Sequence, residues 1–181
     1  MFVSRLIVFF TEAFRQPLRR AASALLAAAC LAACSPEYNW RELDVADGRA
    51  RAAFPARVQT EQRPIVLDGK ELPFSLTAAR VGQAVFAVGH APLPTDPLQR
   101  ERMRQALVAS LYANMGARPP EPAKPDDDIE IRADVNGQPT LLMARVRIYG
   151  DRLVEAVAAG PAQDLPPERA SEFVRSLMPS R

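Results

Sequence analysis

Hydrophobic and polar residues alternate along the last third of the chain, as is typical of strands that bury one face. Ile129 and Ile131 alternate with charged residues, and Asn136-Gly137 separates this run from a second alternating run around Leu142 and Ala144. Asn-Gly favours a two-residue hairpin turn in which both residues have positive φ. The pattern therefore predicts a hairpin with Ile131 opposite Leu142 and Ile129 opposite Ala144.

The following turn is predicted at Gly150-Asp151-Arg152, as a three-residue loop. In that register Arg147 lies opposite Glu155, an opposite-charge pair that stabilises neighbouring strands. Arg145 and Arg147 then point away from the core, on the outward face of the sheet. We therefore expect these two arginines to form a candidate interaction face for an acidic partner, with part of their charge neutralised by Glu155.

The first half of the chain predicts further antiparallel strands. Residues 58–67 and 72–81 flank Asp68-Gly69, which is a strong two-residue hairpin signal. A strand over 84–90 follows a three-residue loop at 81–83, and this register sets Phe74 opposite His90. A short strand at 53–55 precedes them.

Two helices are predicted. Asp96 can cap a helix that has Pro97 in its first turn and ends at Gly116. The second begins at Pro166-Pro167. Each has one apolar stripe, formed in the first by Met103, Leu107, Leu111 and Met115, and in the second by Ala170, Phe173, Val174, Leu177 and Met178. The elements together predict an α+β fold, an antiparallel β-sheet meander flanked by two amphipathic helices, in a single domain over residues 50–181.

The N-terminal segment carries an export pattern. Arg15, Arg19 and Arg20 precede an uncharged run over 21–33, which is too short to span a bilayer, since a span needs about 20 residues. The run ends in Leu31-Ala32-Ala33-Cys34, which resembles the lipobox of bacterial lipoproteins: a branched residue, two small residues and the cysteine that receives a diacylglycerol.

This resemblance implies a signal peptide over 1–33 and lipidation of Cys34, and the unusual length of the segment over 1–20 suggests a misplaced start codon. Residues 34–49 would form the lipidated N-terminus and a tether. Ser35 in place of Asp after the cysteine implies sorting to the periplasmic face of the outer membrane rather than retention at the inner membrane. The alternative is a buried alanine-rich helix. Trp40, inside the tether, could pack on the domain or lie in the membrane interface, and we expect packing.

Charge and cysteine content exclude several classes of partner and bond. Four of the 23 basic residues and one of the 21 acidic residues precede Cys34, so the remainder is nearly neutral. Binding to nucleic acid requires a clustered excess of Lys and Arg, so no nucleic-acid partner is expected. Cys30 and Cys34 are the only cysteines, and removal of the signal peptide would leave no disulfide.

Candidate chemistry is sparse. His90 is the only histidine, which excludes a multi-histidine metal site, and its place on an apolar face favours a core or strand-end imidazole. Asp126, Asp127 and Asp128 follow a Pro-rich loop without the spacing of a calcium site. We therefore predict no catalytic, cofactor or metal residues. The rival hypothesis is a periplasmic hydrolase or lyase in which His90 works with Asp96 or Glu101.

Phe54-Pro55-Ala56-Arg57 before the meander, and Gly150-Asp151-Arg152-Leu153 before its last strand, resemble the corresponding segments of PsbP/Mog1-like domains. The similarity covers residues 50–178 and points to uncharacterised bacterial lipoproteins of that fold. Val154 departs from the pattern, since an aromatic residue is common there. The resemblance implies accessory or assembly roles without a defined catalytic site.

The function expected from the sequence is a non-catalytic, membrane-anchored envelope module. It would bind a partner protein or a ligand on the sheet face or in a cleft beside the Pro-rich loop at 117–128. A structural envelope spacer is the third hypothesis.

Overall fold

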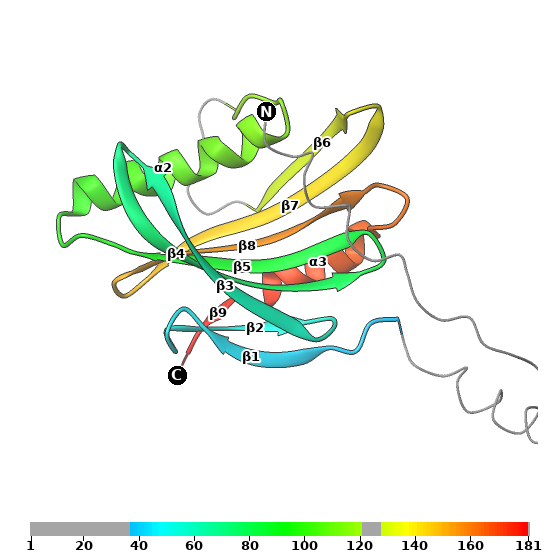
Figure 1. The fold of residues 1–181 in the computed structure, drawn as a ribbon, viewed down its shortest axis with the longest axis horizontal. Helices are drawn as coiled ribbons and strands as arrows, with labels where there is room; N and C mark the ends of the chain where they lie inside the picture. Colours follow the sequence, from blue (N-terminus) through cyan, green and yellow to red (C-terminus); the bar gives the residue numbers. More distant parts are fainter. Residues whose placement is uncertain (1–36, 121–127, 181) are drawn as a thin grey trace, which may run out of the picture. The chain divides into compact units, whose positions relative to one another are not determined.

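A computed structural model describes residues 37–120 and 128–180 of the chain. Its main feature is a six-stranded antiparallel sheet in the order β3-β4-β5-β8-β7-β6. A small sheet in the order β1-β2-β9 lies below the large sheet in Figure 1, and helix α2 lies above it. The structure therefore confirms the predicted α+β class with an antiparallel sheet and two helices.

The elements have the following bounds: β1 Arg41–Val45, β2 Ala50–Phe54, β3 Val58–Leu67, β4 Lys70–Val81, β5 Ala84–Pro92, α2 Pro97–Asn114, β6 Ile129–Val135, β7 Gln138–Tyr149, β8 Arg152–Pro161, α3 Pro167–Ser176 and β9 Met178–Pro179.

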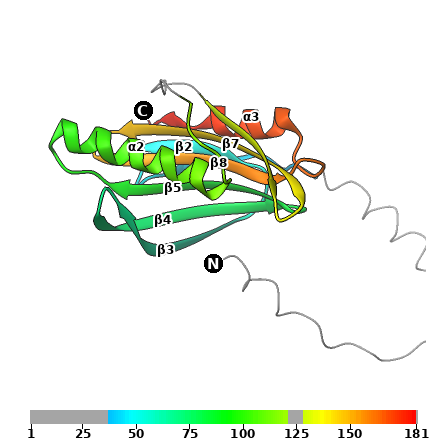
Figure 2. The same ribbon diagram turned by 90° about the horizontal axis from the view of Figure 1, so that it is seen from above.

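Each face of the large sheet packs against a different layer. On the face toward α3, Phe86, Val88 and Val154 join one buried cluster with Phe54 of β2 and Phe173 of α3. On the face toward α2, a second cluster joins strand residues to the helix, and its helical members are Met103, Leu107, Leu111 and the adjacent Met115. Figure 2 shows the two helices on different sides of the sheet. Alternate residues of each strand therefore serve different cores.

Two predicted hairpin turns are confirmed, with their registers. Asp68 and Gly69 have φ of 49° and 73°, and Asn136 and Gly137 have φ of 55° and 80°. Leu67 pairs with Lys70 around the first turn. Around the second, Ile131 pairs with Leu142 and Ile129 with Ala144, as expected. Both turns have positive φ at both central residues, which matches the twist of the flanking strands.

The two other predicted turns were wrong by one residue. Val81 pairs with Ala84, and Tyr149 pairs with Arg152, so each loop has two residues rather than three. Gly82 has φ of 55° and Gly150 has φ of 58°. A glycine in the first central position allows a two-residue turn without positive φ at the second position.

The shift moves side chains to the opposite face of the sheet, as a one-residue slip must. Arg147 lies opposite Val154 rather than Glu155, and Glu155 lies opposite Val146, inside the α2 face. On the neighbouring strands, His90 lies opposite Ser75 rather than Phe74.

The predicted tether over 34–49 also needs correction. Residues 41–45 of that segment form β1, which pairs along its whole length with β2. Trp40 packs edge-on against Phe86 with a centroid distance of 6.3 Å, and Tyr38 lies 6.1 Å from the same ring. Trp40 therefore packs on the domain, as expected. The ordered domain includes residues before 50 because the apolar Leu43 and Val45 alternate toward the core.

The helices form where they were predicted, with one difference. The Asp96 carboxylate accepts a hydrogen bond from the Leu98 amide at the start of α2. Helix α3 ends at Ser176, before the predicted stripe is complete. Met178 enters β9 and is 58% exposed, because the chain there turns to pair with β2. Among the described helices, neither combines the length and apolar character required to cross a bilayer.

Candidate functional site

A groove lies on the α3 face of the large sheet, beside the turn that joins β1 to β2. Its volume is about 420 Å³, and we call it the groove below. It is lined by Asp47, Thr60, Glu61, Gln62, Pro73, Ser75, His90, Pro92 and Arg152. The register explains this set, because Gln62 pairs with Ser75, Ser75 with His90, and Pro92 with Arg152 across four adjacent strands. Asp47, from the β1–β2 turn, also lines the groove.

The β1–β2 turn brings a carboxylate close to the single histidine. The Asp47 Oδ2 atom lies 4.0 Å from His90 Nδ1 and accepts a 2.9 Å hydrogen bond from Arg152 Nε. Arg152 also contacts Asp151 Oδ2 at 2.8 Å. Asp47 has φ of 53°, a left-handed conformation that aspartate tolerates better than most residues. Asp47 is therefore held mainly by Arg152, and its contact with His90 is longer than a hydrogen bond.

The surroundings lower the pKa values of both His90 and Asp47. Burial lowers the pKa of His90, since desolvation disfavours the imidazolium; the nearby Asp47 carboxylate opposes this shift. The hydrogen bond from Arg152 lowers the pKa of Asp47. At neutral pH the groove thus contains a neutral imidazole with 13% of its side chain exposed, beside an ionised carboxylate. A neutral imidazole both donates and accepts hydrogen bonds, so it can contact polar ligands of either kind.

Of the residues that the rival hypothesis named, His90 lines the groove, whereas Asp96 and Glu101 do not. His90 lines an open groove rather than lying inside the core under Phe86. Asp96 caps α2, and Glu101 is bonded to Arg104 and Gln105 on the same helix. Neither lines the groove. The acidic neighbour is Asp47, which belonged to the predicted tether, and no sequence signal connects it with a histidine 43 positions later.

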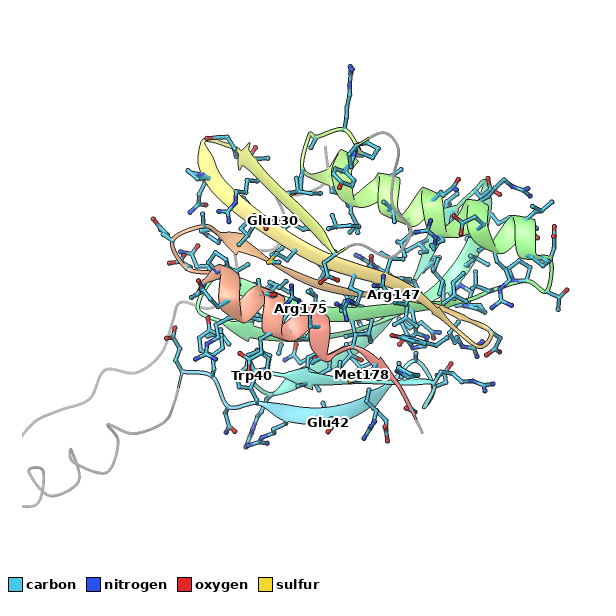
Figure 3. All side chains as sticks on the ribbon, turned by 180° about the vertical axis from the view of Figure 1, so that it is seen from behind. Trp40, Glu42, Glu130, Arg147, Arg175 and Met178 are labelled. Atoms are coloured by element: carbon cyan, nitrogen blue, oxygen red, sulfur yellow. The ribbon has the colours of Figure 1, made fainter. Side chains whose placement is uncertain are left out.

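Arg145 and Arg147, the predicted basic face, are engaged with groups of the domain itself. Arg145 makes a two-point contact with Asp128, at 2.7 Å and 3.0 Å, and only 19% of its side chain is exposed. Arg175 approaches the same carboxylate at 3.4 Å, and the hydrogen bond from Arg145, aided by Arg175, lowers the pKa of Asp128. Arg147 is half-buried and donates a hydrogen bond to the Val146 carbonyl. The two arginines are therefore tied to neighbouring groups, and Figure 3 shows Arg147 and Arg175 on the α3 side.

Glu155 is the residue that the sequence placed least well. It is 9% exposed, its Oε2 atom has no hydrogen-bond partner, and burial raises its pKa to about 7, while Arg63 acts in the opposite direction. It lies opposite Gly89 on β5. Because its side chain faces α2, whereas the groove faces α3, Glu155 does not belong to the groove.

Other sequence predictions concern residues outside the described ranges. Cys34, Asp126 and Asp127 fall there, as do most of the Pro-rich loop and its predicted cleft. Within residues 37–120 and 128–180, no cluster of three or more His, Cys, Asp or Glu side chains could hold a metal ion.

Comparison of the chain with protein-family models, with curated proteins and with solved structures gives no match. The groove and the sequence of the N-terminal segment are therefore the features that indicate a function.

Proposed function

We propose that this chain is a lipid-anchored module of the bacterial envelope that binds a small polar ligand in the groove. The anchor would be a diacylglycerol on Cys34, and the location would be the periplasmic face of the outer membrane. The observation that carries the binding proposal is the groove itself: its volume of about 420 Å³ falls in the range of small-molecule sites.

The lining indicates which ligands fit. Hydroxyl and amide groups come from Thr60, Ser75 and Gln62, and a neutral imidazole comes from His90. No aromatic ring lines the groove among the described residues, so stacking contributes nothing. Arg152, the one Arg or Lys among the described lining residues, is already bonded to two carboxylates, so these residues offer no free guanidinium or ammonium group to an acidic ligand. The set favours a neutral or cationic ligand that makes several hydrogen bonds.

The fold supports a PsbP/Mog1-like assignment as part of this proposal. Pro55 follows the last residue of β2, two three-stranded antiparallel units, β3-β4-β5 and β6-β7-β8, come next and pair through β5 and β8 rather than forming the single meander expected, and an amphipathic helix with a buried Phe173 lies near the end of the domain. Such domains have accessory or assembly roles, which agrees with a binding module.

A pair of variants on one strand tests the proposal. Gln62→Trp fills the groove, whereas Gln59→Trp places the same residue on β3 outside it. The lipoprotein would be extracted from its own envelope, and native mass spectrometry would measure retained small molecules. We expect a ligand on the wild type and on Gln59→Trp, and none on Gln62→Trp.

Other results would contradict the proposal. If all three proteins carry no ligand but a protein co-purifies with each, the module acts through another surface. A deletion strain with a leaky envelope, combined with unaltered behaviour of both variants, would favour the spacer hypothesis. Mass spectrometry of the N-terminal peptide tests the anchor separately, because an unmodified Cys34 would remove the membrane from the proposal.

A second candidate function, hydrolysis, has one specific observation in its favour. Ser75 lies directly opposite His90 on the adjacent strand, and Asp47 Oδ2 lies 4.0 Å from His90 Nδ1. A hydroxyl, an imidazole and a carboxylate in that order resemble a nucleophile, a base and an orienting group. The described hydrogen bonds do not include one between Ser75 and His90, and the Asp47 contact is 4.0 Å.

Labelling with a fluorophosphonate probe tests this candidate. Such a probe reacts only with an activated serine, so a triad predicts labelling that Ser75→Ala and His90→Gln both abolish, while Ser110→Ala on α2 leaves it unchanged. An unlabelled wild-type protein would eliminate the hydrolase.

A further inference from the structure

Strand β3 leaves one border of the large sheet unpaired. It is the first strand in the order β3-β4-β5-β8-β7-β6, and Figure 2 shows it at the edge, next to β4. All residues over 59–64 of this strand are exposed. An edge strand carries amide and carbonyl groups to which a further strand can bond. The middle of this edge is therefore open to a ligand that adopts an extended conformation.

The hairpin register shows which backbone groups of β3 point outward. Leu67 and Lys70 flank a two-residue turn, so they exchange both of their hydrogen bonds. Bonded pairs recur at every second position, so the odd-numbered residues of β3 bond to β4 and the even-numbered residues direct their amide and carbonyl away from it. Thr60 fits this assignment, because a non-bonded pair brings side chains close, and its hydroxyl lies 3.0 Å from that of Thr77. Thr60 and Gln62 therefore offer both an amide and a carbonyl at the edge.

Pro64 limits the open stretch on one side. It belongs to the outward set, so the N–H that proline lacks is not needed by β4, and only its carbonyl can accept a bond from a neighbouring strand. A proline at a sheet edge also prevents long, unspecific strand pairing. The open stretch therefore covers residues 58–63, which suits a peptide of about six residues in an extended conformation.

The open stretch of β3 is also one side of the groove, because Thr60 and Gln62 line it. Even-numbered side chains of β3 lie on the α3 face, where Ser75 and His90 follow Gln62 across the next two strands. Neighbouring strands lie about 4.8 Å apart, so a long side chain on a strand added beside Gln62 reaches over it into the groove. The backbone edge and the groove can therefore hold the same ligand.

Two charged residues of β3 indicate the order of charges in that ligand. Glu61 and Arg63 lie two positions apart on the α2 face, opposite Leu76 and Phe74. Both are exposed, and neither side chain forms an ion pair or hydrogen bond with another residue that the structure describes. Cross-strand pairs of opposite charge stabilise neighbouring strands. An antiparallel peptide therefore fits best with an acidic residue opposite Arg63 and a basic residue opposite Glu61, on either side of the residue that enters the groove.

We propose that the ligand of the groove is a short peptide, which adds to the edge of β3 as an antiparallel strand and places one long polar side chain in the groove. This inference rests on the proposed binding function and names the class of its ligand. The peptide residue opposite Gln62 exchanges two hydrogen bonds with it, as does the residue opposite Thr60, and a third residue donates to the Pro64 carbonyl. The main-chain bonds provide affinity and the groove provides specificity.

A synthetic peptide with two methylated forms tests the proposal. The probe is acetyl-Thr-Glu-Gln-Lys-Thr-Thr-amide, in which Glu, Gln and Lys are placed opposite Arg63, Gln62 and Glu61. N-methylation of its Gln removes an amide that faces β3, whereas N-methylation of its Lys removes one that faces away, and the two forms have the same mass and charge. Calorimetry would use the full lipidated chain in detergent micelles. We expect the first change to weaken binding about tenfold or more and the second by less than about twofold. Equal affinity of the two methylated forms, or no binding of the probe, would overturn the strand addition.

Proline variants make the same test on the protein. Gln62→Pro removes an outward amide inside the open stretch, and Val66→Pro removes an equivalent outward amide beyond Pro64, at a residue that is 67% exposed. Neither amide bonds to β4, so we expect both variants to fold, which thermal unfolding checks. Gln62→Pro should lose the probe, and Val66→Pro should bind it like the wild type. Wild-type affinity in Gln62→Pro would contradict the proposal.

Hydrogen exchange followed by NMR gives a readout that a ligand confined to the groove would not change. With the probe bound, the amides of Thr60 and Gln62 should exchange severalfold more slowly. The amides of Glu61 and Arg63 already bond to β4 and should change less. Unchanged exchange at Thr60 and Gln62 would place the probe elsewhere and refute the pairing.

The ligand that the lipoprotein retains from its own envelope distinguishes this inference from the proposed function. A retained peptide that Gln62→Pro loses supports both. A retained ligand that is not a peptide would refute the strand addition and leave the groove as a binding site. Absence of any retained ligand, together with no binding of the probe, would refute both.

Discussion

Glu155 shows how one residue can make a domain sensitive to pH. Its strand is central in the sheet, with β5 on one side and β7 on the other, and its carboxyl group is buried with one oxygen unpartnered. Burial raises its pKa to about 7, so the folded state favours the protonated acid, whereas the unfolded chain has the ordinary value of 4.5.

We therefore expect stability to fall as pH rises. Below pH 4.5 the group is protonated in both states and its contribution is complete. Between 4.5 and about 7 the unfolded chain releases the proton first, and above that range the loss reaches its limit, on the order of 3 kcal/mol. Urea unfolding at pH 5 and pH 8 measures this difference.

Glu155→Gln should remove most of the pH dependence over this range, since an amide of similar shape does not ionise. Glu71→Gln, an exposed glutamate on β4, is the control and should retain it. If Glu155→Gln left the slope between pH 5 and pH 8 unchanged, another group would be responsible.

Gly89 is a second residue whose identity follows from packing. A Cβ at this position would overlap the Phe74 ring and lie 3.1 Å from Glu155 Oε1. Gly89→Ala should therefore destabilise the domain by about 1–3 kcal/mol. Phe74→Leu should relieve part of that cost, so the double variant should be more stable than the sum of the single effects. Strict additivity, measured by urea unfolding of all four proteins, would exclude the steric conflict.

At the scale of elements, turn chemistry determined what could be predicted. Asp68-Gly69 and Asn136-Gly137 have positive φ at both residues, and their sequences indicate that turn directly. In the Gly82-Gln83 and Gly150-Asp151 turns, only the glycine has positive φ. Many longer loops also contain a single glycine with positive φ. The sequence could not distinguish these cases, and the resulting slip placed Glu155 on the wrong face.

The groove was outside the reach of sequence reasoning for a related reason. His90 could be chosen because it is the only histidine. Asp47, the acidic neighbour of His90, comes from a turn that is distant along the chain. Ser75 lies opposite His90 only in the observed register, not in the predicted one. Strand β1 could have been found from the alternation of Leu43 and Val45, but the segment is short and mostly charged.

The start of α2 provides a test at this scale. Asp96 accepts a 3.1 Å hydrogen bond from the Leu98 amide, which has no partner inside the helix. Asp96→Ala should lower the free energy of unfolding by about 1 kcal/mol, because the cap is lost. Thr95→Ala, one residue earlier and also exposed, should have little effect. Equal effects of both substitutions in thermal unfolding would argue against the cap.

At the scale of the whole molecule, the proposed anchor predicts a measurable orientation, because Tyr38 packs on Phe86 near the β4–β5 turn, whereas the groove lies at the other end of β5, at His90. Both cysteines of the chain precede residue 35, so a lipidated and cleaved protein would have no free thiol. A single cysteine introduced by Gln83→Cys in the β4–β5 turn, or by Gln62→Cys in the groove, can then carry a spin label. We expect the label at 83 to contact headgroups and the label at 62 to be fully accessible to a water-soluble relaxation agent. Equal accessibility in anionic vesicles would contradict the orientation.

The last residues of the domain close its first strands. Met178 pairs with Arg51, and the Ser176 hydroxyl accepts a hydrogen bond from the Ala53 amide across 123 positions of sequence. Figure 3 shows Met178 beside the small sheet. β2 therefore obtains its second neighbour from a strand more than one hundred residues later in the sequence. Until α3 and β9 are in place, Phe54 cannot pack against Phe173, so the small sheet closes over the core only through contacts between distant parts of the domain, and we expect this closure to be a slow step of folding.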